Sequence, residues 1–144
     1  MPKSRSANVI CFGEALWDVL PSMRSVGGAP LNVAYHLKKL GVRAWPMSGV
    51  GNDPLGEELK SQIEEWGLPS DLICSVADRE TGRSLVTVLE GEPNFEVLKD
   101  VAWDYIDVPE NWPVECQPAE ALVFGSLAQL SLIHISEPTR HHVI

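Results

Sequence analysis

The chain has 144 residues, of which 44% are hydrophobic and 22% are charged, and its formal net charge is −9. This length suits one domain with a core large enough to fold. The acidic balance disfavours nucleic acids and anionic membranes as partners, because both attract basic patches. No apolar run approaches the ~20 residues of a membrane-spanning helix.

Cysteine and histidine usage indicates the compartment and argues against a metal site. The three cysteines are Cys11, Cys74 and Cys116, and they form no C-x-x-C pair. Their odd number and wide spacing predict reduced thiols. No apolar signal core precedes Glu14, so a cytoplasmic location is expected. Three of the four histidines lie close to the C-terminus, and the fourth, His36, is expected to be solvated, so no metal site is predicted.

A first strand is predicted near the start of the chain, before Pro21. Residues 8–13 form a short apolar run that ends in glycine, which is typical of a buried strand. Residues 14–20 follow, and within them Asp18 stands alone among apolar neighbours. Asp18 is either an exposed polar position on an edge strand or a carboxylate that accepts hydrogen bonds from ligand hydroxyls, with Trp17 as an apolar wall.

The rest of the chain is organised around residues 26–41, which read VGGAPLNVAYHLKKLG. A glycine pair leads into Pro30, which suits the first turn of a helix because an N–H there would have no intrahelical partner. Gly41 is expected to end this helix as a left-handed cap. Three apolar residues of the helix fall on one face: Val33, Leu37 and Leu40.

The glycine pair, Gly27 and Gly28, has two interpretations. It is either a tight turn before a core helix or a place where a ligand approaches the backbone closely. In the second case the unpaired N–H groups of the first helical turn would point at the ligand. Asn32 favours the second interpretation, because asparagine is a poor helix former and its carboxamide would lie beside the glycines.

A second strand and a second helix follow. Residues 43–50 are predicted as a strand, although Pro46 is unfavourable in a central strand. The helix should begin at Asp53, a good N-cap that precedes Pro54, and end at Gly67. Its apolar residues lie at helical spacing: Leu55, Leu59, Ile63 and Trp66.

Two phosphate-binding patterns begin in this region, and both fail. Gly51 and Gly56 match the glycines of GxxxxGK[ST], but Glu57 and Glu58 stand where Lys and Ser/Thr are required. The GxGxxG pattern has Pro54 at its third glycine position. Dinucleotide binding is therefore poorly supported.

A short strand and a hairpin are predicted next. Residues 72–76 read as the strand, and residues 84–89 are strongly β-prone. Residues 90–94 form a turn cluster, and residues 95–98 read as the return strand. Phe95 could face a ligand, but an aromatic residue in a hairpin is more often a packing residue.

The remaining sequence predicts a loop and one more strand. Residues 99–118 are expected to be loop with a helical turn around 101–106, and Trp103 and Trp112 are expected to pack. Residues 121–124 read as a buried strand. Strands that alternate with helices predict an α/β fold with a parallel sheet, whose ligands bind at the C-terminal ends of the strands.

From Val9 to Leu127 the sequence resembles the ribokinase-like (PfkB-type) carbohydrate kinases, and most of all their fructokinase-like branch. The resemblance rests on GGAPLNVA before a helix that ends in Leu-Gly, on a V-G-x-D-x-x-G turn at residues 50–56, and on FGSLA at residues 124–128. It implies the N-terminal part of a ribokinase-like Rossmann-type parallel sheet with a small β-lid, which is often a dimer contact. It also implies that the turn at residues 50–56 is mostly structural.

The resemblance implies that a sugar is held by five residues: Asp18, Gly27, Gly28, Asn32 and Phe95. The whole enzyme would transfer a phosphoryl group from ATP, with Mg, to a hydroxyl of fructose or a related sugar. The family's catalytic Asp lies in a late G-A-G-D motif that this sequence lacks, so no catalytic residue is assigned and the chain as written is expected to be inactive. The alternative is a non-catalytic α/β module that binds a small polyol. A dinucleotide-dependent enzyme is disfavoured by the failed glycine spacing.

Residues 130–140 read LSLIHISEPTR and look like a translation of the mosaic-end adapter used in transposase-based DNA sequencing. The expected division is therefore residues 1–129 as the sugar-binding part of a kinase domain and residues 130–144 as a non-native tail. The native reading frame is expected to run on after about Gln129.

Overall fold

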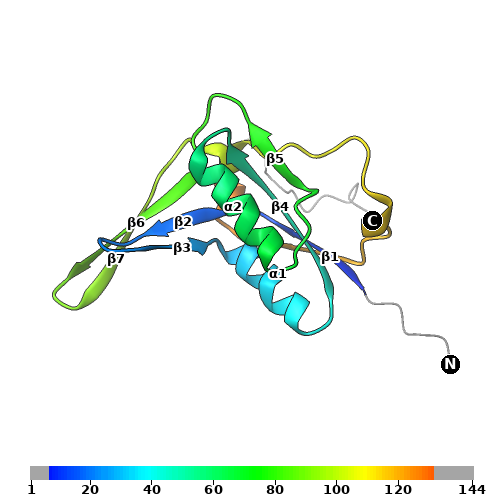
Figure 1. Ribbon diagram of the computed structural model, residues 1–144, viewed down its shortest axis with the longest axis horizontal. Helices are drawn as coiled ribbons and strands as arrows, with labels where there is room; N and C mark the ends of the chain where they lie inside the picture. The colour runs from blue at the N-terminus through cyan, green and yellow to red at the C-terminus, as the bar shows by residue number, and fades with distance from the viewer. Residues whose placement is uncertain (1–6, 132–144) are drawn as a thin grey trace.

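Four parallel strands form the main sheet, in the order β5-β4-β1-β8 (Figure 1). The structure is a computed structural model and describes residues 7–131. The strands of this sheet are β1 (Asn8–Phe12), β4 (Arg43–Gly51), β5 (Ile73–Val76) and β8 (Ala121–Phe124). Two helices connect them in part, α1 (Ala29–Lys39) and α2 (Pro54–Glu65). The predicted α/β class with a parallel sheet is confirmed.

A second, mixed sheet projects from the first and has the order β3-β2-β6-β7 (Figure 1). We call it the lid sheet. Its strands are β2 (Leu16–Val19), β3 (Arg24–Gly27), β6 (Gly82–Leu89) and β7 (Glu92–Val97). Three short 3₁₀ turns complete the described chain: η1 (Ala102–Tyr105), η2 (Val114–Cys116) and η3 (Ala128–Leu130). Between residues 7 and 131, no helix is long and apolar enough to cross a membrane.

Both faces of the central strands β1 and β4 are buried, as is usual for parallel strands, whereas β8 is largely exposed and so is not the buried strand that was predicted. Alternate residues of β1 separate the two cores: Val9 and Cys11 pack under α1 and α2, whereas Ile10 packs on the other face. Both helices lie on one side of the sheet (Figure 1). The long segment around η2 covers part of the other side, where Trp112 packs. The prediction that Trp112 is a packing residue is confirmed.

The buried face of α1 differs from the predicted one. The residues that face the sheet are Leu31 and Ala34, whereas Val33 is 36% exposed and Leu40 is 78% exposed. The fully buried Ala34 has a small side chain, so the helix can lie close to the strands. Of the three predicted residues, Leu37 does pack against this core, where it is partly buried. Spacing alone favoured the larger side chains.

Pro46 is compatible with a central strand for a reason that the register shows. Met47 accepts a hydrogen bond from Gly13 on the β1 side, and Ser48 donates to Leu72 on the β5 side. Because successive residues of a strand alternate between neighbours, the nitrogen of Pro46 is directed toward the β5 side. The pairing with β5 begins only at Ser48, so no ladder hydrogen bond is lost at Pro46.

Two details of the lid sheet were not predicted correctly. The short strand β3 was missed. The strand β7 begins at Glu92 rather than Phe95, because the hairpin turn has only two residues, Glu90 and Gly91, both with positive φ (52° and 80°). This combination is typical of a type I′ hairpin turn. Pro93 is tolerated because β7 is an edge strand.

Candidate functional site

Asp18 lies in the middle of the lid sheet. Its strand, β2, is flanked by β3 and β6, so the edge-strand interpretation of Asp18 is wrong. The carboxylate is half-buried, and burial raises the pKa of Asp18 above its ordinary value. Trp17 points to the opposite face, where its indole N–H donates to Leu55 of α2 at 2.9 Å. Trp17 therefore does not form a wall beside Asp18.

The strand register shows which residues share a face with Asp18. Asp18 is opposite Ser25 on one side and Ser84 on the other, and Ser84 is in turn opposite Val97. Side chains at paired positions point to the same face. Phe95 is two residues from Val97 and so belongs to this face, which we call the Asp18 face.

Gly27 and Gly28 are required by contacts within the chain. A Cβ at Gly27 would collide with the carboxylate of Asp18, and a Cβ at Gly28 would collide with the backbone carbonyl of Glu14. Gly28 also has a φ of +116°, which side chains rarely tolerate. The close approach to the glycine pair is thus made by Asp18 and by the turn between β1 and β2.

Asn32 lies in the first turn of α1, where its backbone N–H donates to Gly28 at 2.9 Å and its side chain is exposed. The structure therefore brings together Asp18, Gly27, Gly28 and Asn32 at the junction of the lid sheet and α1. Phe95 lies two strands away from Asp18 and is 59% exposed. The part that these five residues take in binding stays a prediction.

Glu14 is a residue of this junction that the sequence reasoning missed. It is 5% exposed, and its Oε1 accepts a hydrogen bond from Ala29 N–H at 3.3 Å. Gly28, the N-cap residue, has no side chain to offer, so Glu14 caps α1 in its place. The prediction that the first-turn N–H groups point at a ligand is therefore wrong for Ala29. The sequence did offer one signal: the N-cap residue of α1 is a glycine, so a capping side chain had to come from elsewhere in the chain.

The first turn of α2 is also filled by the chain itself. Asp53 Oδ1 accepts hydrogen bonds from Gly56 N–H at 2.8 Å and from the Thr81 hydroxyl at 2.6 Å, and its Oδ2 accepts from Thr81 N–H at 2.9 Å. Gly51 N–H donates to the Thr81 hydroxyl at 2.9 Å. Burial alone would raise the pKa of Asp53, but the bonds from Thr81 and Gly56 outweigh it and lower that pKa. These contacts agree with a structural role for this turn.

These contacts bear on ATP and magnesium. The N-terminus of each helix already has a carboxylate of the chain, Glu14 or Asp53, where a phosphate would bind. No group of three or more His, Cys, Asp or Glu residues between residues 7 and 131 could hold a metal ion. Between residues 7 and 131, both helix N-termini are thus capped by carboxylates of the chain, and neither offers a free site for a phosphate.

Two pockets lie outside the predicted site. One of about 570 Å³ lies between the end of β7, η1 and η3, and one of about 600 Å³ lies at the N-terminal end of β4. Neither is lined by any of the five predicted residues. Asn32 and Phe95 are exposed, whereas Ser84, which lies beside Asp18 on the Asp18 face, is buried.

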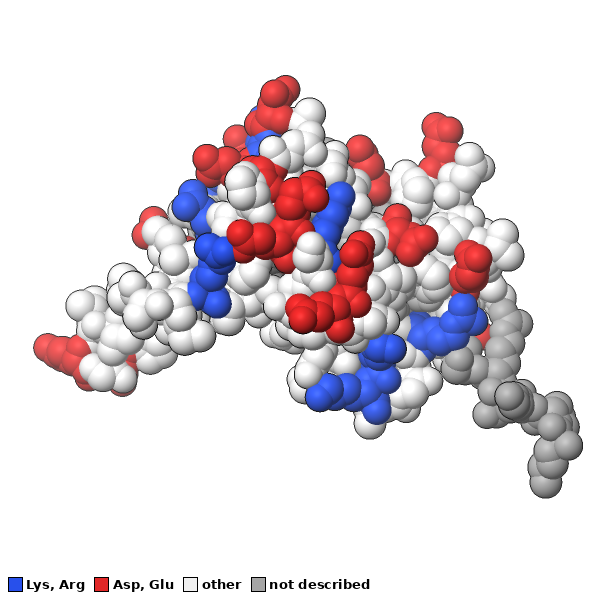
Figure 2. All heavy atoms as spheres, viewed as in Figure 1, with Lys and Arg blue, Asp and Glu red and all other residues white. Residues whose placement is uncertain are grey.

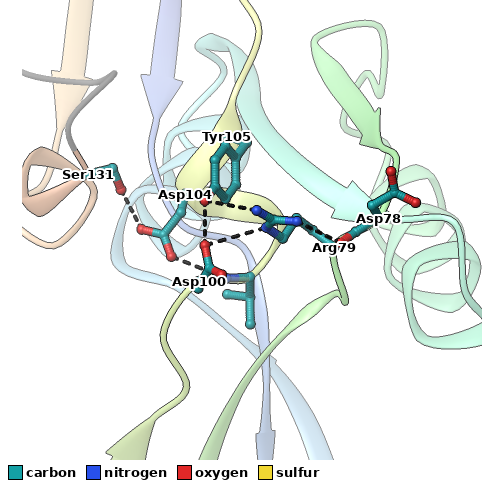
Figure 3. Close-up of polar contacts among 7 residues, drawn as sticks. Asp78, Arg79, Asp100, Asp104, Tyr105 and Ser131 are labelled. Atoms are coloured by element: carbon teal, nitrogen blue, oxygen red, sulfur yellow. Dashed lines mark hydrogen bonds and ion pairs between the residues drawn. The ribbon is translucent and has the colours of Figure 1, made fainter.

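A polar network beside the first pocket joins the β5–β6 loop to η1 (Figure 3). Arg79 donates to the Tyr105 hydroxyl at 3.2 Å and lies 3.4 Å from the Asp100 carboxylate. The Tyr105 hydroxyl donates to Asp100, and the Ser131 hydroxyl donates to Asp104. Each of these side chains has a partner within the chain, which agrees with a structural role for these contacts.

A family model described as pfkB family carbohydrate kinase matches residues 21–135. The chain belongs to this family. It is 33% identical over 113 residues to a putative sugar kinase of Pyrococcus horikoshii, a match that covers 78% of this chain and 36% of the relative. It is 27% identical over 141 residues to an ATP-dependent 6-phosphofructokinase of Thermoanaerobacterium thermosaccharolyticum, covering 81% and 44%.

Solved structures of similar proteins have the same fold. The P. horikoshii sugar kinase in complex with ATP has a TM-score of 0.63 at 30% identity, covering 67% of this chain and 35% of that one. Fructokinase of Xylella fastidiosa with bound ATP gives 0.60 at 33%, covering 67% and 31%. Fructokinase of Vibrio cholerae O395 with fructose, ADP and calcium ion gives 0.61 at 25%, covering 70% and 35%. The chain thus spans well under half the length of these relatives.

Proposed function

We propose that this chain is the N-terminal, sugar-binding part of an ATP-dependent sugar kinase that phosphorylates a hydroxyl of fructose or a related sugar. The observation that carries the proposal is the junction where the Asp18 carboxylate lies against Gly27 and beside the start of α1. Membership of the family and similarity to fructokinases, one of them solved with fructose, support it. A non-catalytic polyol-binding module is the alternative of the sequence analysis, and no structural observation favours it.

Each residue of the junction has a proposed part. The Asp18 carboxylate accepts hydrogen bonds from two sugar hydroxyls, because an ionised carboxylate is an acceptor only. The exposed Asn32 carboxamide both donates and accepts. Gly27 and Gly28 let the Asp18 carboxylate and the Glu14 turn lie close to the backbone at the sugar, and Phe95 covers the apolar side of the sugar. These contacts hold and orient the sugar; they perform no chemistry by themselves.

The ATP site and the catalytic Asp are proposed to lie in a further part of the protein. Neither helix N-terminus between residues 7 and 131 offers a free site for a phosphate, and the relatives are more than twice as long as the matched part. We propose residues 1–129 as the native sugar-binding part and residues 130–144 as the adapter-derived tail, most of which lies outside the described residues. On its own this chain would bind sugar but not phosphorylate it.

Two measurements test the proposed function. The source DNA is read past the codon for Gln129 from an independent library, and the longer protein is assayed for ATP-dependent phosphorylation of fructose and ribose. We expect a continuing frame with a G-A-G-D motif and activity on at least one sugar. A stop codon within a few codons of Gln129 would contradict the proposal and favour the polyol-binding module.

Binding by the chain itself is tested with fructose and the variant Asp18→Asn. Losing a charged hydrogen-bond acceptor costs about 1.5–3 kcal/mol, so the dissociation constant should rise about tenfold to a hundredfold. The exposed Asp107→Asn is the matched control. Equal affinity in Asp18→Asn and the control would remove Asp18 from the site.

Pairing of two copies through the lid sheet and a cytoplasmic location are also proposed. The β6–β7 hairpin exposes Val88, Leu89 and Phe95, and on the face shown in Figure 2 it is a mostly uncoloured projection with acidic residues at its tip. Apolar surface of this kind favours association. Light scattering after size exclusion would show a dimer that Phe95→Ser weakens.

The proposed location rests on the cysteines. All three are free thiols, which suits a reducing compartment.

A further inference from the structure

The Asp18 face has an uneven distribution of charge. By register it carries Asp18, Ser25, Ser84 and Phe95, and the strand residues between 16 and 97 that share it include no Lys or Arg. The arginines of the lid sheet belong to the opposite face. Arg24 lies 5.0 Å over the Trp17 ring and pairs with Glu58 of α2, and Arg83 pairs with Glu80.

A second carboxylate lies where α1 would otherwise attract an anion. Glu14 is 95% buried, being 5% exposed, and its Oε1 accepts from Ala29 N–H. Its Oε2 has no hydrogen-bond partner among the described residues. The next residue, Pro30, has no N–H to give. The partial positive charge of the helix N-terminus is therefore compensated by the chain, and the negative charge of Glu14 is only partly compensated in return.

Both carboxylates lie next to the glycine pair. The Asp18 carboxylate lies against Gly27, and Glu14 Oε1 accepts a hydrogen bond from the N–H of Ala29, the residue after Gly28. A ligand on this backbone is thus close to two negative charges, with no facing cation on the described strands of the lid sheet. Burial lowers the effective dielectric constant, so a charged group on the ligand feels these carboxylates more strongly than it would in water.

We infer that Glu14 makes this junction select an uncharged sugar and reject one that carries a phosphate or carboxylate group. The inference rests on the proposed sugar-binding function and narrows its substrate class. The question is open from similarity alone, because the relatives named here include both fructokinases and a 6-phosphofructokinase. Glu14 acts through its charge and its hold on Ala29, so it is a positioning and selectivity residue.

Inorganic phosphate is the first probe, because its binding does not depend on sugar recognition. Amide NMR spectra of the full 144-residue chain and of Glu14→Gln are recorded during titration with phosphate. We expect the Ala29 and Leu31 amides to shift in Glu14→Gln, with a dissociation constant at least tenfold lower than in the unmodified chain. The exposed Glu110→Gln, which removes the same charge elsewhere, should behave like the unmodified chain.

Equal phosphate affinity in the unmodified chain and in Glu14→Gln, or no binding by either, would overturn the inference. The spectrum of Glu14→Gln also reports whether it is folded. If Glu14→Gln is not folded, Glu14→Asp takes its place, because it keeps the negative charge and should still reject phosphate. Phosphate binding by folded Glu14→Asp, seen as shifts of the same two amides, would equally overturn the inference.

The second probe compares D-fructose with D-fructose 6-phosphate on the unmodified chain and needs no variant. We expect fructose to bind at least tenfold more tightly, and Glu14→Gln to reduce that ratio. Tighter binding of fructose 6-phosphate would overturn the selectivity but leave the proposed kinase function intact. Binding of neither sugar would contradict the proposed function, while the phosphate titration would still decide the role of Glu14.

Discussion

Single carboxylates hold several groups of this chain at once, and Asp53 does so for the start of α2. It accepts from Gly56 and Thr81. The amide nitrogen of Asp53→Asn cannot accept from the buried Thr81, so this variant should lower the free energy of unfolding by about 1–3 kcal/mol, the cost of leaving a buried donor without a partner. The exposed Asp71→Asn is the control. Urea unfolding at neutral pH measures both, and an equal loss in the two variants would contradict the cap.

The same residue predicts a dependence on pH. Because the hydrogen bonds lower the pKa of folded Asp53, its contribution to stability is fully present above the ordinary Asp pKa and is lost as the pH falls through the lowered value. The difference in stability between the parent chain and Asp53→Asn should therefore shrink on acidification. Urea unfolding at a series of acidic pH values tests this; a constant difference would argue against it.

Gly28 and Gly41 offer a matched pair for the junction. Both have positive φ, +116° and +84°, but only at Gly28 would a Cβ collide with the Glu14 carbonyl, whereas nothing lies near Gly41. Gly41→Ala should cost about 1 kcal/mol for backbone strain alone. Gly28→Ala should cost at least about 2 kcal/mol. Thermal unfolding measures both variants. Equal losses of stability in Gly28→Ala and Gly41→Ala would show that the turn at Glu14 moves aside at little cost.

At the scale of elements, the network of Arg79, Asp100 and Tyr105 ties η1 to the β5–β6 loop (Figure 3). The Tyr105 hydroxyl is the main cause of the lowered pKa of Asp100, and Arg79 adds to it. Tyr105→Phe should therefore raise the pKa of Asp100 toward its ordinary value. Carboxyl carbon NMR titration measures this, with Asp71 as an internal reference; an unchanged Asp100 would mean that the hydroxyl points elsewhere.

Elements with local signals could be predicted from the sequence, and those that depend on distant partners could not. Pro30 and the Asp53-Pro54 pair fix the starts of the helices through their own backbone geometry. In contrast, the cap of α1 comes from Glu14, fifteen residues before Ala29. The residue pattern within the helix does not indicate this cap. Trp17 could have been excluded from the Asp18 face by the strand assignment alone, because adjacent residues of a strand point to opposite faces.

At the scale of the whole molecule, the edge strand β8 exposes Leu122 and Phe124 by 52% and 50%. An apolar strand at the edge of a sheet favours association with other chains. Leu122→Lys should reduce concentration-dependent light scattering. Val114→Lys, at an exposed position outside the sheets, is the control and should have less effect. If both variants scatter like the parent chain, β8 is not the adhesive edge.

Gly27 is the last residue of β3 and Gly28 the N-cap of α1, so two consecutive residues join the lid sheet to the helix that packs on the main sheet. There is no spacer between the two bodies at this point. A ligand bound at this junction would contact both of them at once. Such a ligand is therefore expected to fix the angle between the two sheets, whereas without it the angle depends on the packing around the junction.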